Sequence, residues 1–312
     1  MKSLSPHVAS RRAWLQRAAA AAAALTLAPS CATSATTRPA RYLIGCYTRP
    51  WDQLDYRVAL DGIAEAGFQY VGLMTARGRP SLVVHVDSTP EEVAAVAAAV
   101  KARGLKVISI YGGDFRAEQS VAAGVAGLKR LVDYCVTCGC PHLLLGGTGD
   151  AKVFPAYYQA VREVCPYAEQ KQVTLTIKPH GGLNATGPEC RKIIESVGHR
   201  RFRLWYDPGN IFYYSDGKLD PVEDAGTVNG LVAGMSVKDF LPPKEVMLTP
   251  GTGRVNFPEV MRRLQRGGFT AGPLVIECLA RGNGQDARFI VAEAKKARAF
   301  VEGLAAGVPP RS

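Results

Sequence analysis

The stretch RLWYDPGN (residues 203–210) begins with a short run of strand-forming residues that ends on a charged residue, Asp207, and this layout recurs three more times. LTIKPH (175–180), SVKDF (236–240) and PLVIECL (273–279) also carry a charged residue where a short strand-like run ends. Short runs of β-branched and aromatic residues are typical of buried strands. Because parallel strands in an α/β barrel present their chemistry at their carboxyl ends, we expect the four segments to meet at one mouth of a barrel.

The chain alternates short apolar runs with longer helical patterns from Arg41 to Leu304. Eight strands are expected, at residues 42–47, 69–74, 107–111, 143–145, 173–178, 203–207, 231–238 and 273–278. The helices expected after them lie at residues 56–66, 90–103, 117–135, 154–170, 187–197, 219–228, 257–266 and 284–304. Eight repeats predict a single-domain (β/α)8 TIM barrel over residues 41–304. An open doubly wound sheet is the alternative, but no G-x-G-x-x-G dinucleotide signature follows the first strand.

The first 32 residues have the layout of an export signal. Ser10-Arg11-Arg12 resembles a twin-arginine motif, the apolar stretch 18–27 follows it, and small residues lead to a cleavage point after Ala32. The apolar stretch is shorter than the roughly 20 residues that span a bilayer, so no transmembrane helix is expected. A disordered Ala-rich tail is the alternative. The sequence therefore predicts a periplasmic protein with three flanking segments: a signal peptide (1–32), a linker (33–40) and a flexible tail (305–312).

Cys31 gives the signal a second interpretation. Ala28-Pro29-Ser30-Cys31 is a poor lipoprotein box, in which Cys31 would carry a lipid anchor. A single lipid chain gives only marginal membrane binding unless a second signal helps. A membrane-anchored periplasmic lipoprotein is therefore kept beside the cleaved form.

The charge of the chain points to no polymeric partner. The formal charge is +11, and the residues up to Cys31 carry four Lys or Arg and no acid, so their removal leaves 11 − 4 = +7. No block of Lys and Arg with interleaved aromatic residues is present, so no nucleic-acid partner is expected. A modest positive balance fits neutral or anionic small molecules. None of these features bears on the oligomeric state.

The eight cysteines are scattered along the chain. Cys135, Cys138 and Cys140 form C-x-x-C-x-C, but no fourth ligand follows at a zinc-site spacing. We expect buried free thiols, because free cysteine is among the most buried residue types. A Cys135–Cys138 disulfide is the alternative in an oxidising compartment.

Four motifs together give the chain a family resemblance. They are DPGN (207–210), GTGRVNF (251–257), GGFTAG (267–272) and VIECL (275–279). In this combination the chain resembles the xylose isomerase-like TIM barrels of the sugar phosphate isomerase/epimerase superfamily, over residues 41–304. The resemblance implies a small-molecule carbohydrate as the ligand. It also implies metal ligands of the types Glu, Asp, His and Glu at the ends of strands five to eight.

The chain departs from that family at two of the four ligand positions. Lys178 stands where the family has Glu, and Ser236 stands where it has His. An ammonium group has no lone pair to give to a cation and repels it. Asp207 and Glu277 remain as metal ligands, with His180 as a third. Mn, Mg or Zn is therefore a doubtful cofactor of this chain.

The alternative to a metal is that Lys178 takes its place between Asp207 and Glu277. Two nearby carboxylates need a positive neighbour to stay ionised, and Lys178, helped by Lys238, supplies it. In this hypothesis the ammonium groups and a His180 imidazolium polarise a sugar carbonyl, and one carboxylate moves the neighbouring proton. A Schiff base on lysine is a less favoured use, because two acids raise the pKa of the amine. A structural ion pair at the barrel mouth is the non-catalytic alternative.

Four further residues are candidates for substrate binding: Tyr47, Tyr111, Asn210 and Ser236. The two tyrosines end strands and offer faces on which a sugar ring stacks, but they serve equally well as barrel filling. Gly146-Gly147-Thr148-Gly149 and Gly181-Gly182 allow a close backbone approach to a ligand, without the spacing of a phosphate loop.

The sequence thus predicts a carbohydrate isomerase or epimerase, or a related lyase, that transfers a proton next to a carbonyl at the C-terminal face of the barrel. Two alternatives remain. One is a catalytically decayed periplasmic carbohydrate-binding protein, because loss of two ligand types is also what decay produces. The other is a metal-dependent phosphodiesterase of the endonuclease IV-like branch, which needs more His and acidic ligands than five histidines supply.

Overall fold

The computed structural model describes residues 41–282 and 286–307. The expected signal peptide, the linker, Cys31 and the end of the expected tail lie outside the described residues. Of the expected tail, residues 305–307 are described, and the last helix runs into it to Ala305.

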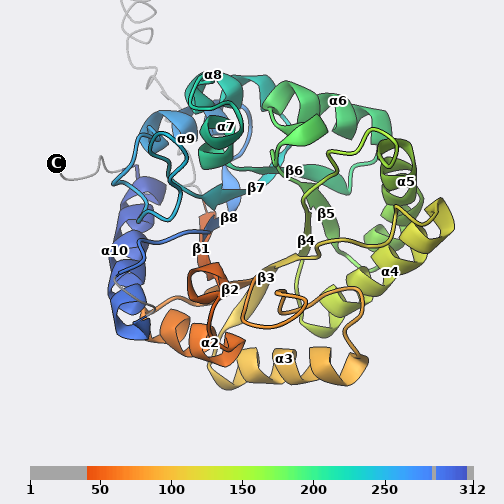
Figure 1. The fold of residues 1–312 in the computed structure, drawn as a ribbon. Helices are drawn as coiled ribbons and strands as arrows, with labels where there is room; N and C mark the ends of the chain where they lie inside the picture. The colour runs from red at the N-terminus through yellow and green to blue at the C-terminus, as the bar shows by residue number, and fades with distance from the viewer. Residues whose placement is uncertain (1–40, 283–285, 308–312) are drawn as a thin grey trace, which may run out of the picture. The chain divides into compact units, whose positions relative to one another are not determined.

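Eight parallel strands close into one barrel in the order β1 to β8 (Figure 1). β1 pairs with β2 on one side and with β8 on the other, and this second pairing closes the sheet. The strands are β1 (Arg41–Tyr47), β2 (Tyr70–Leu73), β3 (Lys106–Tyr111), β4 (His142–Leu145), β5 (Thr174–Ile177), β6 (Phe202–Tyr206), β7 (Val232–Val237) and β8 (Ala271–Ile276). The predicted TIM barrel is confirmed, and the open sheet is excluded because β1 and β8 are hydrogen-bonded.

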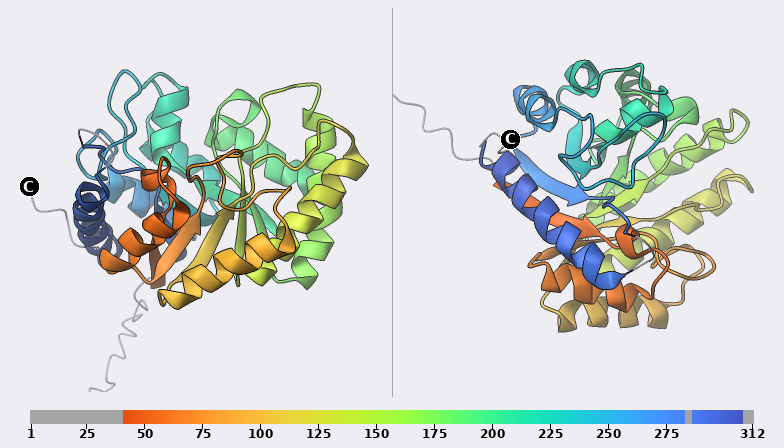
Figure 2. Two further views of the ribbon diagram at one scale, coloured as in Figure 1. Left: turned by 60° about the horizontal axis from the view of Figure 1, so that its bottom comes forward. Right: turned by 60° about the vertical axis from the view of Figure 1, so that its left-hand side comes forward.

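Helices surround the barrel on the outside (Figures 1 and 2). The α-helices are α2 (Tyr56–Glu65), α3 (Pro90–Ala102), α4 (Val121–Thr137), α5 (Phe154–Gln170), α6 (Gly187–Val197), α7 (Pro208–Tyr214), α8 (Pro221–Ala225), α9 (Phe257–Arg266) and α10 (Ala287–Ala305). The described residues also form short 3-10 helices, namely η1 (Arg49–Trp51), η2 (Gly182–Asn184) and η3 (Gly226–Val228). α3 and α6 both begin with a threonine cap, a proline and a reciprocal glutamate, which fixes their starts.

Three helical segments differ from expectation. α4 begins at Val121 rather than at residue 117, because Ser120 caps it. The expected helix at 219–228 divides into α8 and η3. α7 was not expected at all. It follows β6 directly, because Asp207 caps it and Pro208 provides a preset first turn.

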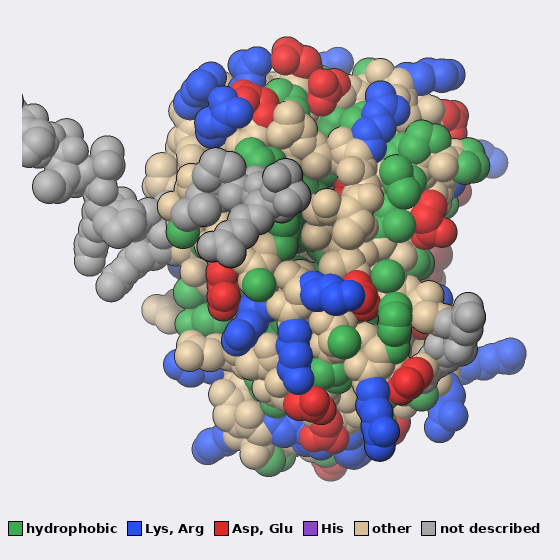
Figure 3. Space-filling model, turned by 90° about the vertical axis from the view of Figure 1, so that its left-hand side faces the viewer, with side chains coloured by type: hydrophobic (Ala, Val, Ile, Leu, Met, Phe, Trp, Pro, Cys, Tyr) green, Lys and Arg blue, Asp and Glu red, His purple; other side chains and the backbone are tan. Residues whose placement is uncertain are grey.

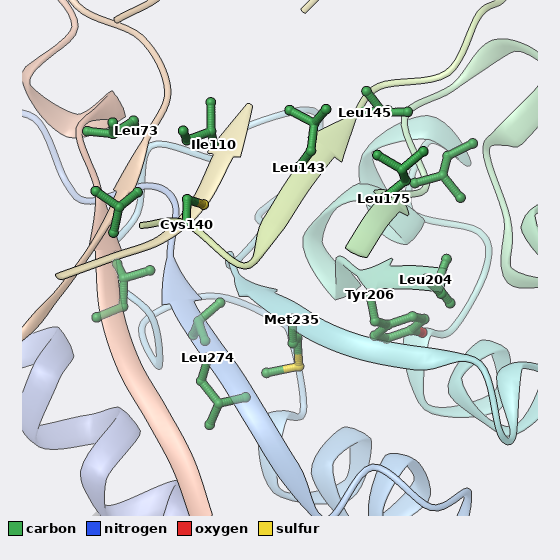
Figure 4. Packing of buried hydrophobic residues seen from close by; sticks show 14 of the residues in the cluster. Leu73, Ile110, Cys140, Leu143, Leu145, Leu175, Leu204, Tyr206, Met235 and Leu274 are labelled. Atoms are coloured by element: carbon green, nitrogen blue, oxygen red, sulfur yellow. The ribbon is translucent and has the colours of Figure 1, made fainter. Parts of the chain in front are cut away.

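The barrel wall separates two hydrophobic layers. Outward-facing strand residues such as Leu143, Leu175 and Leu204 pack under the helices in the larger layer (Figure 4). A smaller cluster fills the barrel interior with Tyr47, Met74, Ile108, Leu144, Trp205 and Val275. The alternation of the two layers along each strand follows from the two-residue period of side chains. It decides which residues at the strand ends face the axis.

The face that carries α10 is mixed in charge, and the described cysteines are unpaired. On the face that carries α10, basic and acidic side chains are interspersed (Figure 3). Over the described residues, no helix combines the length and the apolar character needed to cross a membrane. The seven cysteines of the described part are free thiols, so the Cys135–Cys138 disulfide is not formed.

The glycine at position 234 is a direct test of interior packing. A Cβ on Gly234 would lie 2.4 Å from the fully buried ring of Trp205, which has no room to move. We predict that Gly234→Ala lowers the free energy of unfolding by about 1–3 kcal/mol through overpacking. Denaturant unfolding measures this. Gly226→Ala is the matched control, because a Cβ there meets no atom within 4 Å; equal effects of the two changes would contradict the packing account.

Candidate active site

The charged mouth of the barrel is built by the last four strands. β5, β6, β7 and β8 each stop one residue before a charged side chain, and these are Lys178, Asp207, Lys238 and Glu277. The last residue of each strand belongs to the outer hydrophobic layer. By the two-residue period, the next side chain therefore turns toward the barrel axis. The local sequence pattern thus delivers four charges to one place.

Lys178 lies between the two carboxylates. Its Nζ donates to Oδ2 of Asp207 at 3.0 Å and to Oε2 of Glu277 at 2.8 Å. All three side chains are at most 2% exposed. Two buried carboxylates do not both stay ionised without a positive neighbour, and the ammonium group supplies that charge. The structure therefore brings together the three residues that the sequence analysis placed in one site.

Glu277 accepts hydrogen bonds from four side chains. Its Oε1 accepts from Nη1 of Arg49 at 2.5 Å and from Nζ of Lys238 at 3.2 Å. Its Oε2 accepts from Oγ of Ser236 at 2.8 Å, in addition to Lys178. Burial alone would raise the pKa of this carboxyl, but the three cations, led by Lys178, hold the pKa of Glu277 well below its usual range. Glu277 is therefore a fixed anion at neutral pH.

The same pairing fixes the charge of Lys178. Burial alone would lower the pKa of its amine, but Glu277 and then Asp207 outweigh burial and raise the pKa of Lys178 above its usual value. A Schiff base requires a neutral amine. The geometry thus disfavours the Schiff-base alternative.

Asp207 and Asn210 connect the site to the start of α7. Oδ1 of Asp207 accepts from the backbone N–H of Asn210 at 2.9 Å. The side-chain Nδ2 of Asn210 donates to the carbonyl of Pro179 at 2.6 Å, and its Oδ1 accepts from Nζ of Lys238 at 2.7 Å. Asn210 is 1% exposed, so the structure places it as a support for Lys238 and the loop after β5. Its expected contact with substrate stays a prediction.

Gly209 makes room for Lys238. A Cβ at this position would lie 2.7 Å from the backbone oxygen of Lys238 and 2.8 Å from its Cγ. The DPGN motif therefore has one task for each residue: Asp207 caps α7, Pro208 starts it, Gly209 admits the lysine and Asn210 orients it.

Ser236 and Tyr47 lie one layer below the charges. Oγ of Ser236 donates to Glu277 and accepts from Nε1 of Trp205 at 3.2 Å. Tyr47 is fully buried, and its hydroxyl donates to Oγ of Ser109 at 2.9 Å. Both residues occupy the barrel interior. For Tyr47 this agrees with the alternative that its ring fills the barrel. Their expected contact with substrate also stays a prediction.

Tyr111 and His180 line a cavity of about 320 Å3 beside the charges. Their ring centroids are 6.4 Å apart. The cavity is also lined by two acids and a glycine-rich loop, at Asp114, Glu118 and residues 146–148. None of the strand-end charges lines the cavity, but Asn184 ties the backbone of Lys178 to Gly146 in its wall, and His180 follows Lys178 by two residues. The cavity therefore adjoins the charged cluster, whose strand-end members are covered.

His180 is a neutral imidazole in this site. Loss of hydration among the surrounding residues, and after it the charge of Lys178, lowers the pKa of His180 to about 3. The side chain is nevertheless exposed to solvent, which screens both effects, and a lowered pKa leaves the imidazole neutral at pH 7. The lowered pKa disfavours the expected imidazolium donor, whose role stays a prediction. At neutral pH His180 offers one N–H donor and one lone pair.

Arg49 is a site residue that the sequence analysis missed. It stands two residues after the end of β1, in η1, and donates to Glu277 at the end of the neighbouring strand β8. Its side chain is 27% exposed, more than those of the four strand-end charges. In the sequence, only its position just after a strand could have indicated a site residue. No recognisable motif surrounds this arginine.

Two buried polar residues that support the site were also missed. Nδ2 of Asn184 donates to the carbonyl oxygens of Lys178 and Gly146, both at 2.9 Å, and so ties the loop after β5 to the loop after β4. Asp239 accepts four backbone N–H groups, those of Phe240, Gly251, Gly253 and Val255. It therefore holds the family-like GTGRVNF loop in place. In the sequence, the position of Asp239 directly after Lys238 was the feature that could have pointed to it.

The donor set at the strand ends does not fit a divalent metal. Nζ of Lys178 occupies the space between Asp207 and Glu277 where a cation would bridge them. Throughout residues 41–282 and 286–307, no three His, Cys, Asp or Glu side chains gather as a metal site requires. His180 accordingly does not join the two carboxylates as a third ligand.

The family is shown by comparison with known proteins. The model of the xylose isomerase-like TIM barrel family matches residues 60–303. The chain belongs to this family, which confirms the resemblance seen in the sequence. No curated protein matches the sequence significantly.

Solved structures share the fold at low sequence identity. A D-psicose 3-epimerase from Clostridium cellulolyticum H10, crystallised with D-tagatose, is 17% identical, with a TM-score of 0.66, and the match covers 84% of this chain and 99% of that one. An L-ribulose 3-epimerase is 18% identical, with a TM-score of 0.64 and coverages of 85% and 94%. A xylose isomerase domain protein from Planctomyces limnophilus is 21% identical, with a TM-score of 0.64 and coverages of 85% and 97%. At these identities the likeness establishes the fold.

The charge of Lys178 has a measurable effect on stability. Lys178→Met leaves Asp207 and Glu277 buried without the cation between them, so we predict a loss of about 3–5 kcal/mol in the free energy of unfolding at neutral pH. Without the ammonium group a carboxyl pKa rises above its unfolded value, and protonation then relieves the repulsion. The loss is therefore expected to be smaller near pH 5 than near pH 8.

Denaturant unfolding at the two pH values checks this. Lys152→Met, at an exposed position before α5, is the control and should change little. A loss for Lys178→Met that does not vary with pH would show that the lysine contributes packing rather than charge.

Proposed function

We propose that this barrel acts on a sugar as an isomerase, an epimerase or a related lyase, by moving a proton next to a carbonyl group. The observation that supports this most is the buried ammonium of Lys178, held between two carboxylates at the C-terminal mouth of the barrel. Family membership and the sugar epimerases among the structural neighbours support the carbohydrate class, and the step from fold to function is by analogy.

Fixed cations supply the electrophilic part of this chemistry. Removal of a proton next to a carbonyl places negative charge on the carbonyl oxygen. Preorganised donors in a water-poor site stabilise that charge without reorganising. Lys178, Lys238 and Arg49 converge on this point, and each is held by Glu277. Glu277 therefore serves as the anion that gathers the donors.

The same arrangement assigns the base. Glu277 is a poor base, because three cations hold its pKa well below the usual range. Asp207 accepts from one cation and one backbone N–H. We assign the transfer of the proton to Asp207. In an isomerase Asp207 returns the proton to the adjacent carbon, while a hydroxyl proton passes from one oxygen of the enediol to the other. In an epimerase Asp207 keeps that proton, and a donor on the opposite face of the carbon supplies another. In a lyase, a neighbouring hydroxyl leaves as water.

His180 and Tyr111 complete the site from the cavity side. A neutral imidazole donates through its N–H and accepts at its other nitrogen, which suits the hydroxyl groups of a sugar. The ring of Tyr111 offers an apolar face to a sugar ring. The cavity that they line lies in the lower part of the range of roughly 300–1,000 Å3 typical of small-molecule sites.

A carbohydrate-binding protein with a decayed active site is the second candidate. The observation that favours it is the closure of the charged network, in which the four strand-end side chains are at most 6% exposed. The phosphodiesterase alternative has no such support, because the described residues bring no three metal-ligand side chains together.

Proton exchange from solvent distinguishes an enzyme from a binder. We predict that the protein incorporates deuterium next to the carbonyl of at least one keto-sugar in heavy water, as measured by NMR. Asp207→Asn should slow the exchange by about 10²–10⁴-fold, the usual contribution of a general base. Asp52→Asn, which removes a carboxylate paired with Arg281, is the control and should exchange at the wild-type rate. Wild-type protein that labels no sugar in a broad panel would favour the binding protein.

A further inference from the structure

The charges at the barrel mouth do not balance. Three cations, Arg49, Lys178 and Lys238, meet two carboxylates, Asp207 and Glu277. The cluster therefore carries one formal positive charge in excess. His180 does not alter this count, because its imidazole is neutral at pH 7. A buried net charge is costly, so a site of this kind is stabilised when an anion enters it.

Two other acids near the mouth are already bound within the chain, and no ion pair among the described residues joins Asp114 or Glu118 to the three cations. The carboxylate of Asp239 is taken by four backbone N–H groups. That of Asp52 is paired with Arg281 at 2.6 Å. Asp114 and Glu118 lie in the loop between β3 and α4, where they line the cavity.

The three cations also have hydrogen-bond donors left over. Lys178 and Lys238 each use two of three N–H groups on partners within the described chain. Arg49 uses one N–H group of its guanidinium on Glu277, in contacts among the described residues. Because Arg49 is also the most exposed of these charges, it is the first that a ligand from solvent would reach.

The adjoining cavity gives a ligand its direction. Tyr111, His180 and Gly146 line the part nearer the cations, because Asn184 bonds the backbone oxygens of both Gly146 and Lys178. Asp114 and Glu118 line the part formed by the β3–α4 loop. Carboxylates accept hydrogen bonds from hydroxyl groups and repel an anion. A ligand with an anionic end and a polyol end would therefore place the anion at the cations and the hydroxyl groups at the acids.

We propose that this site takes a monosaccharide bearing one carboxylate, a sugar acid, and that Arg49 is the residue that selects for its charge. The carbohydrate part of this statement rests on the proposed function. A planar guanidinium matches a carboxylate through two parallel hydrogen bonds. One excess positive charge matches a monoanion, whereas the phosphate of a sugar phosphate carries nearly two negative charges at pH 7.

Calorimetric titration with three matched probes tests the proposal. D-glucuronate carries the carboxylate, D-glucose lacks it, and D-glucose 6-phosphate carries a phosphate on the same ring. We expect glucuronate to bind about 10- to 100-fold more tightly than glucose, the range expected for a charge-assisted hydrogen bond. Glucose 6-phosphate should bind more weakly than glucuronate.

Variants then assign the effect to one side chain. Arg49→Met should bring the affinity for glucuronate down to about that for glucose, while the affinity for glucose itself changes less than about threefold. Arg49→Lys keeps the positive charge but lacks the planar guanidinium, so its affinity for glucuronate should lie between those of wild type and Arg49→Met. Arg281→Met is the control, because Arg281 is an arginine of the same rim that pairs with Asp52, and it should retain the preference. If Arg49→Met does not fold, the wild-type ratio and Arg49→Lys still decide.

Three results would overturn the inference: equal binding of glucose and glucuronate, tighter binding of glucose 6-phosphate, or an unchanged preference in Arg49→Met. The outcome is independent of turnover. Glucuronate that binds selectively without proton exchange in any sugar would leave this inference standing and reject the proposed enzyme. Exchange into neutral keto-sugars without a preference for sugar acids would reject the inference alone.

Discussion

The buried ammonium of Lys178 holds the mouth of this barrel together. Its Nζ donates to Asp207 at 3.0 Å and to Glu277 at 2.8 Å, and each of the three side chains is at most 2% exposed. Without a positive charge there, the two carboxylates would repel each other in a medium of low dielectric constant. With it, Glu277 stays ionised and in turn holds Lys238 and Arg49. One ion-paired lysine thus organises five charges from strands and loops far apart in the chain.

This arrangement also explains how the chain differs from the metal-site pattern that its family resemblance implies. A divalent ion and an ammonium group both neutralise carboxylates and both polarise an oxygen. An ammonium group does so through directed N–H donors on a tether, and it brings one charge instead of two. The two additional cations, Lys238 and Arg49, add two positive charges, one more than this difference. The result is a site with fixed donors and a net positive charge, suited to an oxyanion.

Much of this could be read from the sequence because the information is local. Each of β5 to β8 is an apolar run followed directly by a charged residue, and the two-residue period sends that residue inward. The remaining features depend on contacts that no short motif encodes. Arg49 gains its role only when β1 pairs with β8. Asn184 acts by bridging two loops. The lowered pKa of His180 follows from its burial and the nearby charge of Lys178, with smaller effects from Glu277, Lys238 and Arg49.

Metal titration tests the central claim, that an ammonium group fills the place of a metal. Wild-type protein, dialysed against Mn²⁺, Mg²⁺ or Zn²⁺ and then against metal-free buffer, is compared by elemental analysis with Lys178→Glu treated in the same way. The account predicts far less than one metal ion per wild-type chain and a measurable gain in Lys178→Glu, where three carboxylates would meet. One tightly held ion per wild-type chain, lost in Asp207→Asn, would contradict it.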